Sequence, residues 1–185
     1  MRVITGTARG RRLITLDGED VRPTTDKVKE ALFSIIQFEI EGRRVLDLFA
    51  GSGQLGIEAL SRGAAGCVFV DQSKQAIGVI KKNLETCGFT DSARVYQSDS
   101  LTYLSVTASP KERYDIALLD PPYASGLLKK ALPLVAEHMN RGGVIICESP
   151  SDMELPEQAG DFTRRKVYRY GKIGMSLYRH KDIEQ

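Results

Sequence analysis

Residues 44–60 read RVLDLFAGSGQLGIEAL, and this stretch carries the strongest fold information in the chain. It opens with an apolar run and continues into Gly51, Gly53 and Gly56, which are spaced as G-x-G-x-x-G. A helical pattern follows from Ile57 to Leu60. A strand, a glycine turn and a helix in that order bring a nucleotide against the backbone. The stretch therefore predicts a nucleotide-binding unit of an open α/β sheet.

The flanking sequence continues the alternation of apolar runs and helical patterns. This alternation predicts a parallel sheet with crossover helices on both faces. On the N-terminal side, Thr25 can cap a helix over 26–40, with Asp26 in its first turn. The expected strands are 44–49, 67–71, 93–97, 114–119 and 143–148, and the expected helices between them are 54–62, 74–87, 99–105 and 125–139.

The two ends of the chain differ from this pattern. Two β-rich stretches, 162–170 and 174–180, predict an antiparallel hairpin that completes a seven-stranded, mostly parallel α/β sheet. Residues 1–24 form a small basic extension that we expect to fold as a hairpin, and 25–185 are expected to form a single domain. A chain of 185 residues is long enough to bury one core without disulfides or metal.

Composition narrows the class of protein further. Hydrophobic residues are 42% and charged residues 27% of the chain, as in soluble globular domains. No stretch reaches membrane-spanning length, and the first residues lack a secretory signal, so a cytoplasmic protein with no membrane partner is expected. Isolated cysteines and histidines predict neither a disulfide framework nor a metal site; they are Cys67, Cys87, Cys147, His138 and His180.

Positive charge gathers at both ends, although the net charge is only +2. Residues 1–12 carry four arginines and no acid, and residues 163–181 carry seven Lys and Arg and no acid. Clustered basic residues of this kind suit the phosphate backbone of a nucleic acid. A solvated basic surface without a ligand explains the charge equally well.

Carboxylates at the strand ends indicate which nucleotide is bound. Asp71 follows Gly51 by 20 positions, where a carboxylate can accept both ribose hydroxyl protons. Asp47 stands just before the glycine turn, where it would repel the pyrophosphate of a dinucleotide and attract the cationic groups of S-adenosylmethionine. Asp99 could accept from an adenine amino group or serve only as an N-cap. The predicted cofactor-binding residues are Asp47, Gly51, Ser52, Gly53, Asp71, Gln72, Asp99 and Ser100.

The run 114–123, YDIALLDPPY, ends a predicted buried strand in an unusual tip. The Asp120 carboxylate and the Pro121 carbonyl can each accept one N–H of a planar amine, which aims the nitrogen lone pair at a methyl donor. Pro122 stiffens the tip, and Tyr123 can stack on an unstacked base. These four residues, Asp120 to Tyr123, are the predicted catalytic residues. A proline-rich turn without a function is the alternative.

These residues resemble the amino-directed nucleic-acid methyltransferases, whose signature is Asp-Pro-Pro-Tyr. Four further motifs make the chain similar to the bacterial guanine-N2 methyltransferases of small-subunit (16S) ribosomal RNA; they are GTARGRRL at 6–13, RPT at 22–24, EALF at 30–33 and LDLFAGSG at 46–53. The resemblance spans nearly the whole chain and implies a Rossmann-like class I methyltransferase fold. Two departures, Gln54 and Lys29, lie beside these motifs where a small residue and an arginine are expected.

The resemblance also implies the reaction and the partners. It implies a monomer that uses S-adenosylmethionine, without a metal, to methylate N2 of guanine 966 of 16S rRNA in the 30S particle or an assembly intermediate. The residues alone reach only a nucleobase or a similar planar amine. The N-terminal extension would then face RNA through Arg9, Arg11, Arg12 and Arg22.

Three alternatives stay open at this point. An N6-adenine or N4-cytosine DNA methyltransferase could use the same tip, but it predicts a target-recognition insert for which a chain of 185 residues leaves no room. An NAD-dependent oxidoreductase could use the glycine turn, and it would tolerate Asp47→Ala. A nucleic-acid-binding module that has lost activity is the third alternative, and the intact motifs argue against it.

Overall fold

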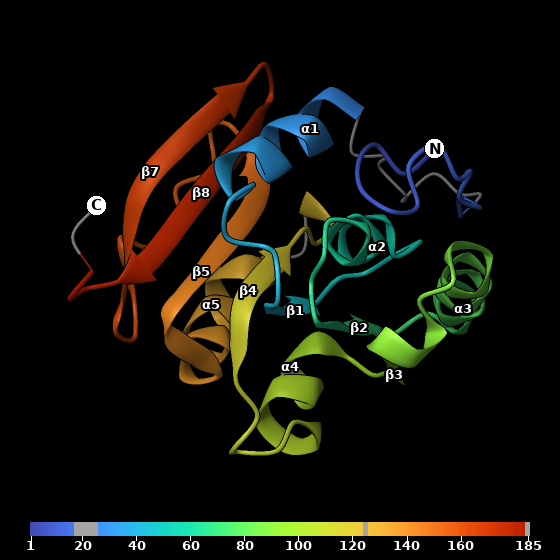
Figure 1. Cartoon of the computed structure of the whole chain (residues 1–185). Helices are drawn as coiled ribbons and strands as arrows, with labels where there is room; N and C mark the ends of the chain where they lie inside the picture. Colours follow the sequence, from blue (N-terminus) through green and yellow to red (C-terminus); the bar gives the residue numbers. More distant parts are fainter. Residues whose placement is uncertain (17–25, 124–125, 184–185) are drawn as a thin grey trace.

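A computed structural model describes residues 1–16, 26–123 and 126–183 of the chain (Figure 1). Over these residues one sheet of eight strands has the order β3-β2-β1-β4-β5-β8-β7-β6. The strands from β1 to β5 are parallel to one another, whereas β6, β7 and β8 pair antiparallel. The strands are β1 (Arg44–Asp47), β2 (Gly66–Asp71), β3 (Ala93–Gln97), β4 (Tyr114–Leu119), β5 (Met139–Pro150), β6 (Gln158–Ala159), β7 (Phe162–Tyr170) and β8 (Ile173–His180).

The strand order reverses between β1 and β4, and this reversal positions the site. From β1 the chain moves outward to β2 and β3, and it then returns to place β4 on the other side of β1. The pairing of Asp47 with Leu118 brings the carboxyl ends of β1 and β4 side by side. Ligands of open α/β sheets bind at such a switch point, outside the carboxyl ends of the strands. The α/β class predicted from the sequence is confirmed.

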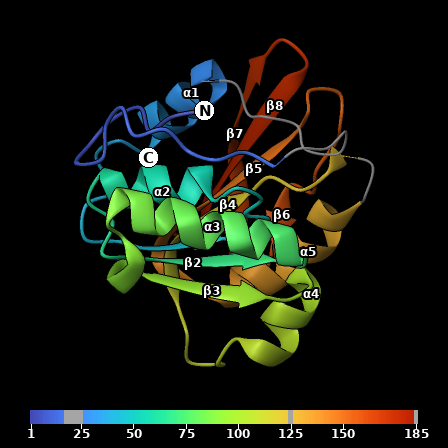
Figure 2. The same cartoon turned by 90° about the vertical axis from the view of Figure 1, so that its right-hand side faces the viewer.

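Helices cover the two faces of the sheet (Figures 1 and 2). One apolar cluster joins α1, α2 and α3 to one face, and a second joins α4 and α5 to the other. The helices are α1 (Asp26–Ile35), α2 (Gln54–Ser61), α3 (Lys74–Cys87), the short α4 (Ser100–Thr102) and α5 (Leu127–Glu137), with a 3₁₀ turn at Thr90–Ser92 and a π-helix at Tyr103–Thr107. No helix within the described ranges is long and apolar enough to cross a membrane.

Several predicted boundaries move in the structure. The helix expected over 26–40 ends at Ile35, because Ile36 and Ile40 are buried from turns and not from a continued helix. Strand β5 begins at Met139 and not at 143, since its pairing partners extend it over twelve residues. The helix expected over 99–105 splits into α4 and the π-helix. The eighth strand, β6, is a two-residue addition to the predicted seven.

The described part of the N-terminal extension folds back on itself without forming a regular hairpin. Its one antiparallel bridge joins Arg2 to Arg12, and Val3 exchanges backbone hydrogen bonds with Gly10 and Arg11. The rest of the extension, 17–24, including Arg22, lies outside the described residues. We refer to residues 1–16 as the N-terminal arm.

Candidate active site

The glycine turn between β1 and α2 has the conformation that its sequence demands. Gly51 and Gly53 have φ angles of +55° and +79°, in the left-handed region that residues with a Cβ rarely adopt. Gly56 has a different role, because a Cβ there would lie 2.3 Å from the ring of Phe69 on β2. This glycine lets α2 pack closely on the sheet. Ser52, between the first two glycines, is buried.

Asp71, at the carboxyl end of β2, holds the glycine turn from outside. Its Oδ2 accepts the Gly51 N–H at 2.9 Å, and its Oδ1 accepts the Ser73 N–H at 2.8 Å. The side chain is half-buried, and the neighbouring Gln72 is exposed. The carboxylate thus lies at the edge of the turn, where the sequence predicts a ribose to bind.

Asp47, at the carboxyl end of β1, is buried beneath the same turn. Only 1% of the residue is exposed, and its Oδ2 accepts the Gly56 N–H in the first turn of α2 at 2.9 Å. Burial raises the pKa of Asp47 to about 7; the Gly56 N–H lowers this pKa, and the carboxylates of Asp120 and Asp71 raise it. Three carboxylates therefore act on one another at the switch point, an arrangement that a cationic ligand would stabilise.

Asp99 lies beyond β3 and is an N-cap. Its Oδ1 accepts the N–H groups of Leu101 and Thr102 at 3.0 Å, while the side chain is exposed and Ser100 is buried. These bonds match the capping alternative that the sequence left open. A contact of Asp99 with adenine stays a prediction.

The tip after β4 lies near Asp47, since the Asp120 carboxylate helps to raise the pKa of Asp47. Asp120 is half-buried and Pro121 is buried, whereas Pro122 is exposed. The Tyr123 hydroxyl donates to Oε1 of Glu148, near the carboxyl end of β5, at 3.1 Å. This hydrogen bond fixes one edge of the aromatic ring to the neighbouring strand.

An apolar pocket of about 200 Å³ opens beside the tip. Its walls come from three separate segments: the tip itself, the start of α5, and the chain that follows β5. The lining residues are Pro121, Pro122, Tyr123, Gly126, Leu127, Leu128, Lys129, Pro150 and Met153. A pocket with an apolar lining beside a carboxylate suits a flat, partly apolar group that presents an amine.

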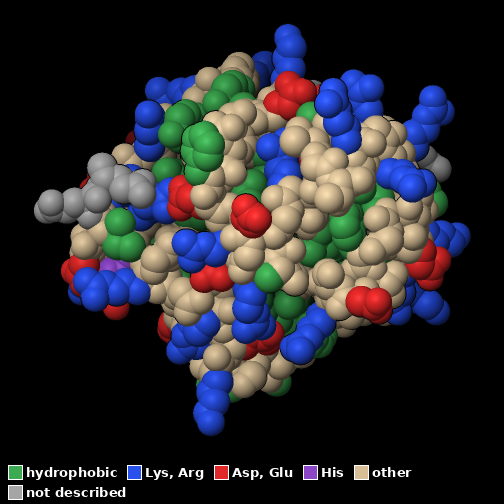
Figure 3. Space-filling model, viewed as in Figure 1, with side chains coloured by type: hydrophobic (Ala, Val, Ile, Leu, Met, Phe, Trp, Pro, Cys, Tyr) green, Lys and Arg blue, Asp and Glu red, His purple; other side chains and the backbone are tan. Residues whose placement is uncertain are grey.

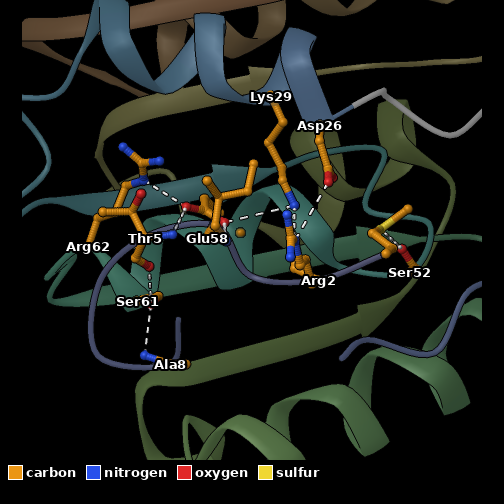
Figure 4. A network of polar contacts seen from close by, with 12 residues as sticks. Arg2, Thr5, Ala8, Asp26, Lys29, Ser52, Glu58, Ser61 and Arg62 are labelled. Carbon is orange, nitrogen blue, oxygen red and sulfur yellow. Dashed lines mark hydrogen bonds and ion pairs between the residues drawn. The ribbon is translucent and has the colours of Figure 1, made fainter. Parts of the chain in front are cut away.

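The N-terminal arm docks on α2 through buried polar contacts (Figure 4). Both oxygens of the buried Glu58 accept backbone N–H groups of the arm, from Ile4 at 2.8 Å and Thr5 at 3.0 Å. Lys29, fully buried on α1, lies 3.8 Å from Glu58 Oε2 and donates to the carbonyl of Arg2 at 2.7 Å. The arm therefore has a defined position on the molecule.

Among the arginines predicted to face RNA, Arg9 lies near the end of α2 that is far from the glycine turn, and Arg22 lies outside the described residues. Arg9, Arg11 and Arg12 are exposed. The turn that carries Arg9 is bonded to Ser61, at the C-terminal end of α2, through Thr7 and Ala8. The glycine turn lies at the opposite end of this eight-residue helix, about 12 Å away. Another contact ties the arm to the site: Asn83 of α3 donates to the carbonyls of Ser52 and Ile14.

Four functional candidates were not among the sequence-predicted site residues: Glu148, Asn83, Met153 and Gln54. Glu148 follows a buried apolar run in the same way as Asp47, so the strand-end signal could have found it. Asn83 and Met153 carry no such signal, because only the fold brings them to the site. The Oε1 of Gln54, the first residue of α2, is buried and has no hydrogen-bond partner within the described structure. Such an acceptor beside the acidic residues fits a ligand with amino or hydroxyl donors.

Comparisons with known proteins identify the family of the chain. The family described as Conserved hypothetical protein 95 matches residues 1–179. YlbH of Bacillus subtilis, named as a candidate rRNA methyltransferase, is 43% identical over 98% of the chain and 100% of its own length. Ribosomal RNA small subunit methyltransferase D of Escherichia coli is 33% identical over 98% of the chain and 90% of its own length.

A solved structure shows the same architecture. The yhhF protein of Escherichia coli, described as a candidate methyltransferase, superimposes with a TM-score of 0.86 and 34% identity over 97% of each chain. The Rossmann-like methyltransferase fold expected from the resemblance is thereby confirmed. The chain belongs to the Conserved hypothetical protein 95 family, and it is a relative of the small-subunit rRNA methyltransferase D proteins, as its motifs indicated.

Proposed function

We propose that the protein transfers a methyl group from S-adenosylmethionine to the exocyclic N2 amine of a guanine in 16S rRNA. The observation that carries the proposal is the position of the Asp120–Tyr123 tip between an acidic donor side and an apolar pocket. The rRNA methyltransferases among its relatives support RNA as the substrate class. Guanine 966 as the target rests on the family resemblance.

On the donor side, the residues present fit a cationic nucleoside. S-adenosylmethionine, when bound, supplies an electrophilic methyl group on a positively charged sulfur. Asp71, which accepts the Gly51 N–H at the edge of the turn, would accept the ribose hydroxyl protons, and the buried Asp47 would favour positive charge near the turn. The same charge would repel the pyrophosphate of a dinucleotide, which argues against the NAD-dependent alternative.

On the acceptor side, Asp120 and Pro121 orient the amine. The Asp120 carboxylate and the Pro121 carbonyl each accept one N–H, so the nitrogen lone pair points along the line of transfer. The nitrogen forms a bond to the methyl carbon as the carbon–sulfur bond breaks. The amine then loses a proton to Asp120 or to water. Positioning provides most of the acceleration, and no strongly basic group is needed.

The pocket and Tyr123 hold the base after it leaves its stack. The Tyr123 ring, fixed through its hydroxyl to Glu148, offers a stacking surface worth about 1–3 kcal/mol per base. Pro122, Leu127 and Met153 give the same pocket an apolar lining. Flipping of the target base into a pocket of this kind is common among enzymes that modify bases.

The N-terminal arm supplies RNA affinity in this proposal. Replacing Arg9, Arg11 and Arg12 by Ala should weaken binding of 16S rRNA. The slope of log affinity against log salt concentration should become shallower by about 0.7 for each phosphate that the variant no longer neutralises. Binding titrations over a series of salt concentrations measure this slope. An unchanged slope would assign the three arginines to a solvated surface.

The reaction itself can be tested in one experiment. The purified protein, as a monomer, is incubated with methyl-labelled S-adenosylmethionine and unmodified 30S particles, naked 16S rRNA or DNA, and the products are digested to nucleosides. N2-methylguanosine from the particle or its RNA is expected. Methyladenine or methylcytosine in DNA would keep the amine chemistry and overturn the RNA assignment. Absence of label despite donor binding would overturn the proposed substrate.

A further inference from the structure

The basic stretch 163–181 forms β7 and β8, and most of its charge is already engaged within the protein. Five of its seven Lys and Arg residues have partners among the described residues. They are Arg164, bonded to the Leu155 carbonyl; Arg165, bonded to the carbonyls of His180, Lys181 and Ile183; Lys166, over the Tyr168 ring; Arg179, paired with Glu39; and Lys181, paired with Asp161.

The remaining two, Arg169 and Lys172, are at the tip of the hairpin. Both are exposed, and neither side chain has a hydrogen bond or ion pair with any residue in the described ranges. Tyr170 between them is 39% exposed. The turn is tight, because Tyr170 pairs with Ile173 and Gly171 has a φ of +60°, as the first turn residue of a type II′ hairpin requires. The two charges are therefore presented by a rigid element.

The sheet register places this tip beside the catalytic pocket. Strand β8 runs antiparallel to β5 and pairs Ile173 with Pro150, the last residue of β5. The chain after β5 is bonded to the turn, since the Ser151 N–H donates to the Lys172 carbonyl at 2.9 Å. Pro150 and Met153, on either side of Ser151, both line the pocket. The unpaired charges of the hairpin thus lie at the edge where a base would enter.

We propose that the β7–β8 tip is a second RNA-contact surface, which binds the phosphates that flank the target nucleotide. The inference rests on the proposed function and extends it from the base to the surrounding strand. Arg169 and Lys172 would each neutralise a phosphate, and Tyr170 would stack on a neighbouring unpaired base. Lys and Arg side chains protrude around the upper rim of the molecule, where the tip, α1 and the N-terminal arm lie (Figures 1 and 3). The arm would contact RNA farther from the pocket.

The test compares two charge-matched double variants. Arg169→Ala with Lys172→Ala removes the tip charges. Arg94→Ala with Lys111→Ala removes two exposed charges near the amino ends of β3 and β4, away from the carboxyl ends that form the site; Arg94 Nη1 lies 3.7 Å from Glu112 Oε1. The tip variant should weaken binding to unmodified 16S rRNA and lower the slope of log affinity against log salt concentration by about 1.4, which corresponds to about 0.7 for each of two phosphates. Its KM for RNA should rise while kcat at saturating RNA and S-adenosylmethionine binding stay unchanged. The control variant should match the unaltered protein.

Equal losses of RNA affinity in the two variants would mean that the tip acts only as nonspecific positive charge, and this result would overturn the inference. No loss in either would also overturn it, while continued methyl transfer would leave the proposed function intact. If the unaltered protein methylates no RNA, the proposed function fails. The comparison of RNA affinity between the two variants then still decides whether the tip binds RNA.

A photocrosslinker attached at Lys172→Cys tests the position directly. Crosslinks to nucleotides adjacent to the methylated guanine are expected. Crosslinks confined to distant or scattered nucleotides would contradict the placement.

Discussion

The donor side and the acceptor side of the site are built by different physical means. On the donor side, the ends of β1 and β2 hold the glycine turn through bonds between carboxylates and backbone N–H groups, from Gly56 to Asp47 and from Gly51 to Asp71. On the acceptor side, prolines and an aromatic ring shape an apolar pocket, with the bond from Tyr123 to Glu148 linking the ring to β5.

In the proposed function, this difference separates binding of the methyl donor from methyl transfer to the base. Backbone N–H groups and carboxylates create fixed polarity, which suits a charged nucleoside that must be held in one orientation. A stiff tip beside an apolar pocket suits a base that enters, reacts and leaves. Changes on the donor side should therefore alter donor affinity, and changes on the acceptor side should alter methyl transfer or the KM for RNA. The following variants test that separation.

Asp120→Ala should have the largest effect. It removes an acceptor at the reacting amine, so kcat should fall by about 100- to 1,000-fold, as for loss of one preorganised polar group in other enzymes. Donor binding, measured by calorimetry, should persist, because the bonds of Asp47 and Asp71 to the turn are intact. Asp152→Ala is the control, since it removes an exposed carboxylate two residues beyond β5. Full activity of Asp120→Ala would refute the amine mechanism.

Tyr123→Ala should raise the KM for RNA by about five- to 150-fold, the equivalent of one stacking contact of about 1–3 kcal/mol. Tyr123→Phe keeps the ring and loses only the hydroxyl bond to Glu148, so its effect should be much smaller. Steady-state kinetics with varied RNA distinguish the two. Equal effects would show that the hydroxyl, and not stacking, is what matters.

Donor affinity should increase with pH because of Asp47. Its pKa of about 7 means that the carboxylate is mostly neutral at acid pH and ionised at alkaline pH, and only the ionised form attracts a cation. Affinity for S-adenosylmethionine should therefore rise about tenfold from about pH 6 to about pH 8. The Asp47→Asn variant should bind more weakly at the higher pH and lack this dependence. A pH-independent affinity in the unaltered protein would exclude the role.

Asn83→Ala should have the smallest effect, and it probes a link between the donor side and the N-terminal arm. The variant loses the bonds that Asn83 donates to the carbonyls of Ser52 and Ile14 and the bond that it accepts from the Ile14 N–H. Loss of about 1 kcal/mol should weaken donor binding about fivefold. Thermal unfolding controls for a general loss of stability. Unaltered donor affinity would mean that the arm does not support the glycine turn.

The spacing of apolar residues along the chain predicted most of the helices and strands, because that spacing follows the repeat of each element. The helix over 74–87 and the strands over 93–97, 114–119 and 162–170 have the bounds that their apolar periodicity predicts. The end of α1 and the start of β5 were misplaced because contacts between distant segments decide them. Ile36 and Ile40 continue a helical spacing, yet the chain must leave the helix to enter β1, and strand β5 is lengthened by partners distant in sequence.

The candidate site was predictable where one segment contains the signal. Asp47 and the glycine turn are contiguous in sequence, as are the four residues of the tip, so their chemistry can be recognised without a structure. Glu148, Met153 and Asn83 come from separate segments, and no periodicity relates them to the tip or to the turn. Arg9 and Arg11 were recognised as basic, but their distance from the tip depends on how the arm docks on α2.

The sequence by itself determined the order of strands and helices and the glycine conformations, because these depend on neighbours along the chain; it also predicted the residues of the candidate site. Only the tertiary structure decided which groups meet. Parallel pairing of β1 with β4 brings Asp47 near Asp120, burial raises the pKa of Asp47, and antiparallel pairing of β5 with β8 brings the β7–β8 turn next to Pro150, which lines the pocket. Pairing and burial depend on contacts between segments far apart in sequence, which local patterns do not specify.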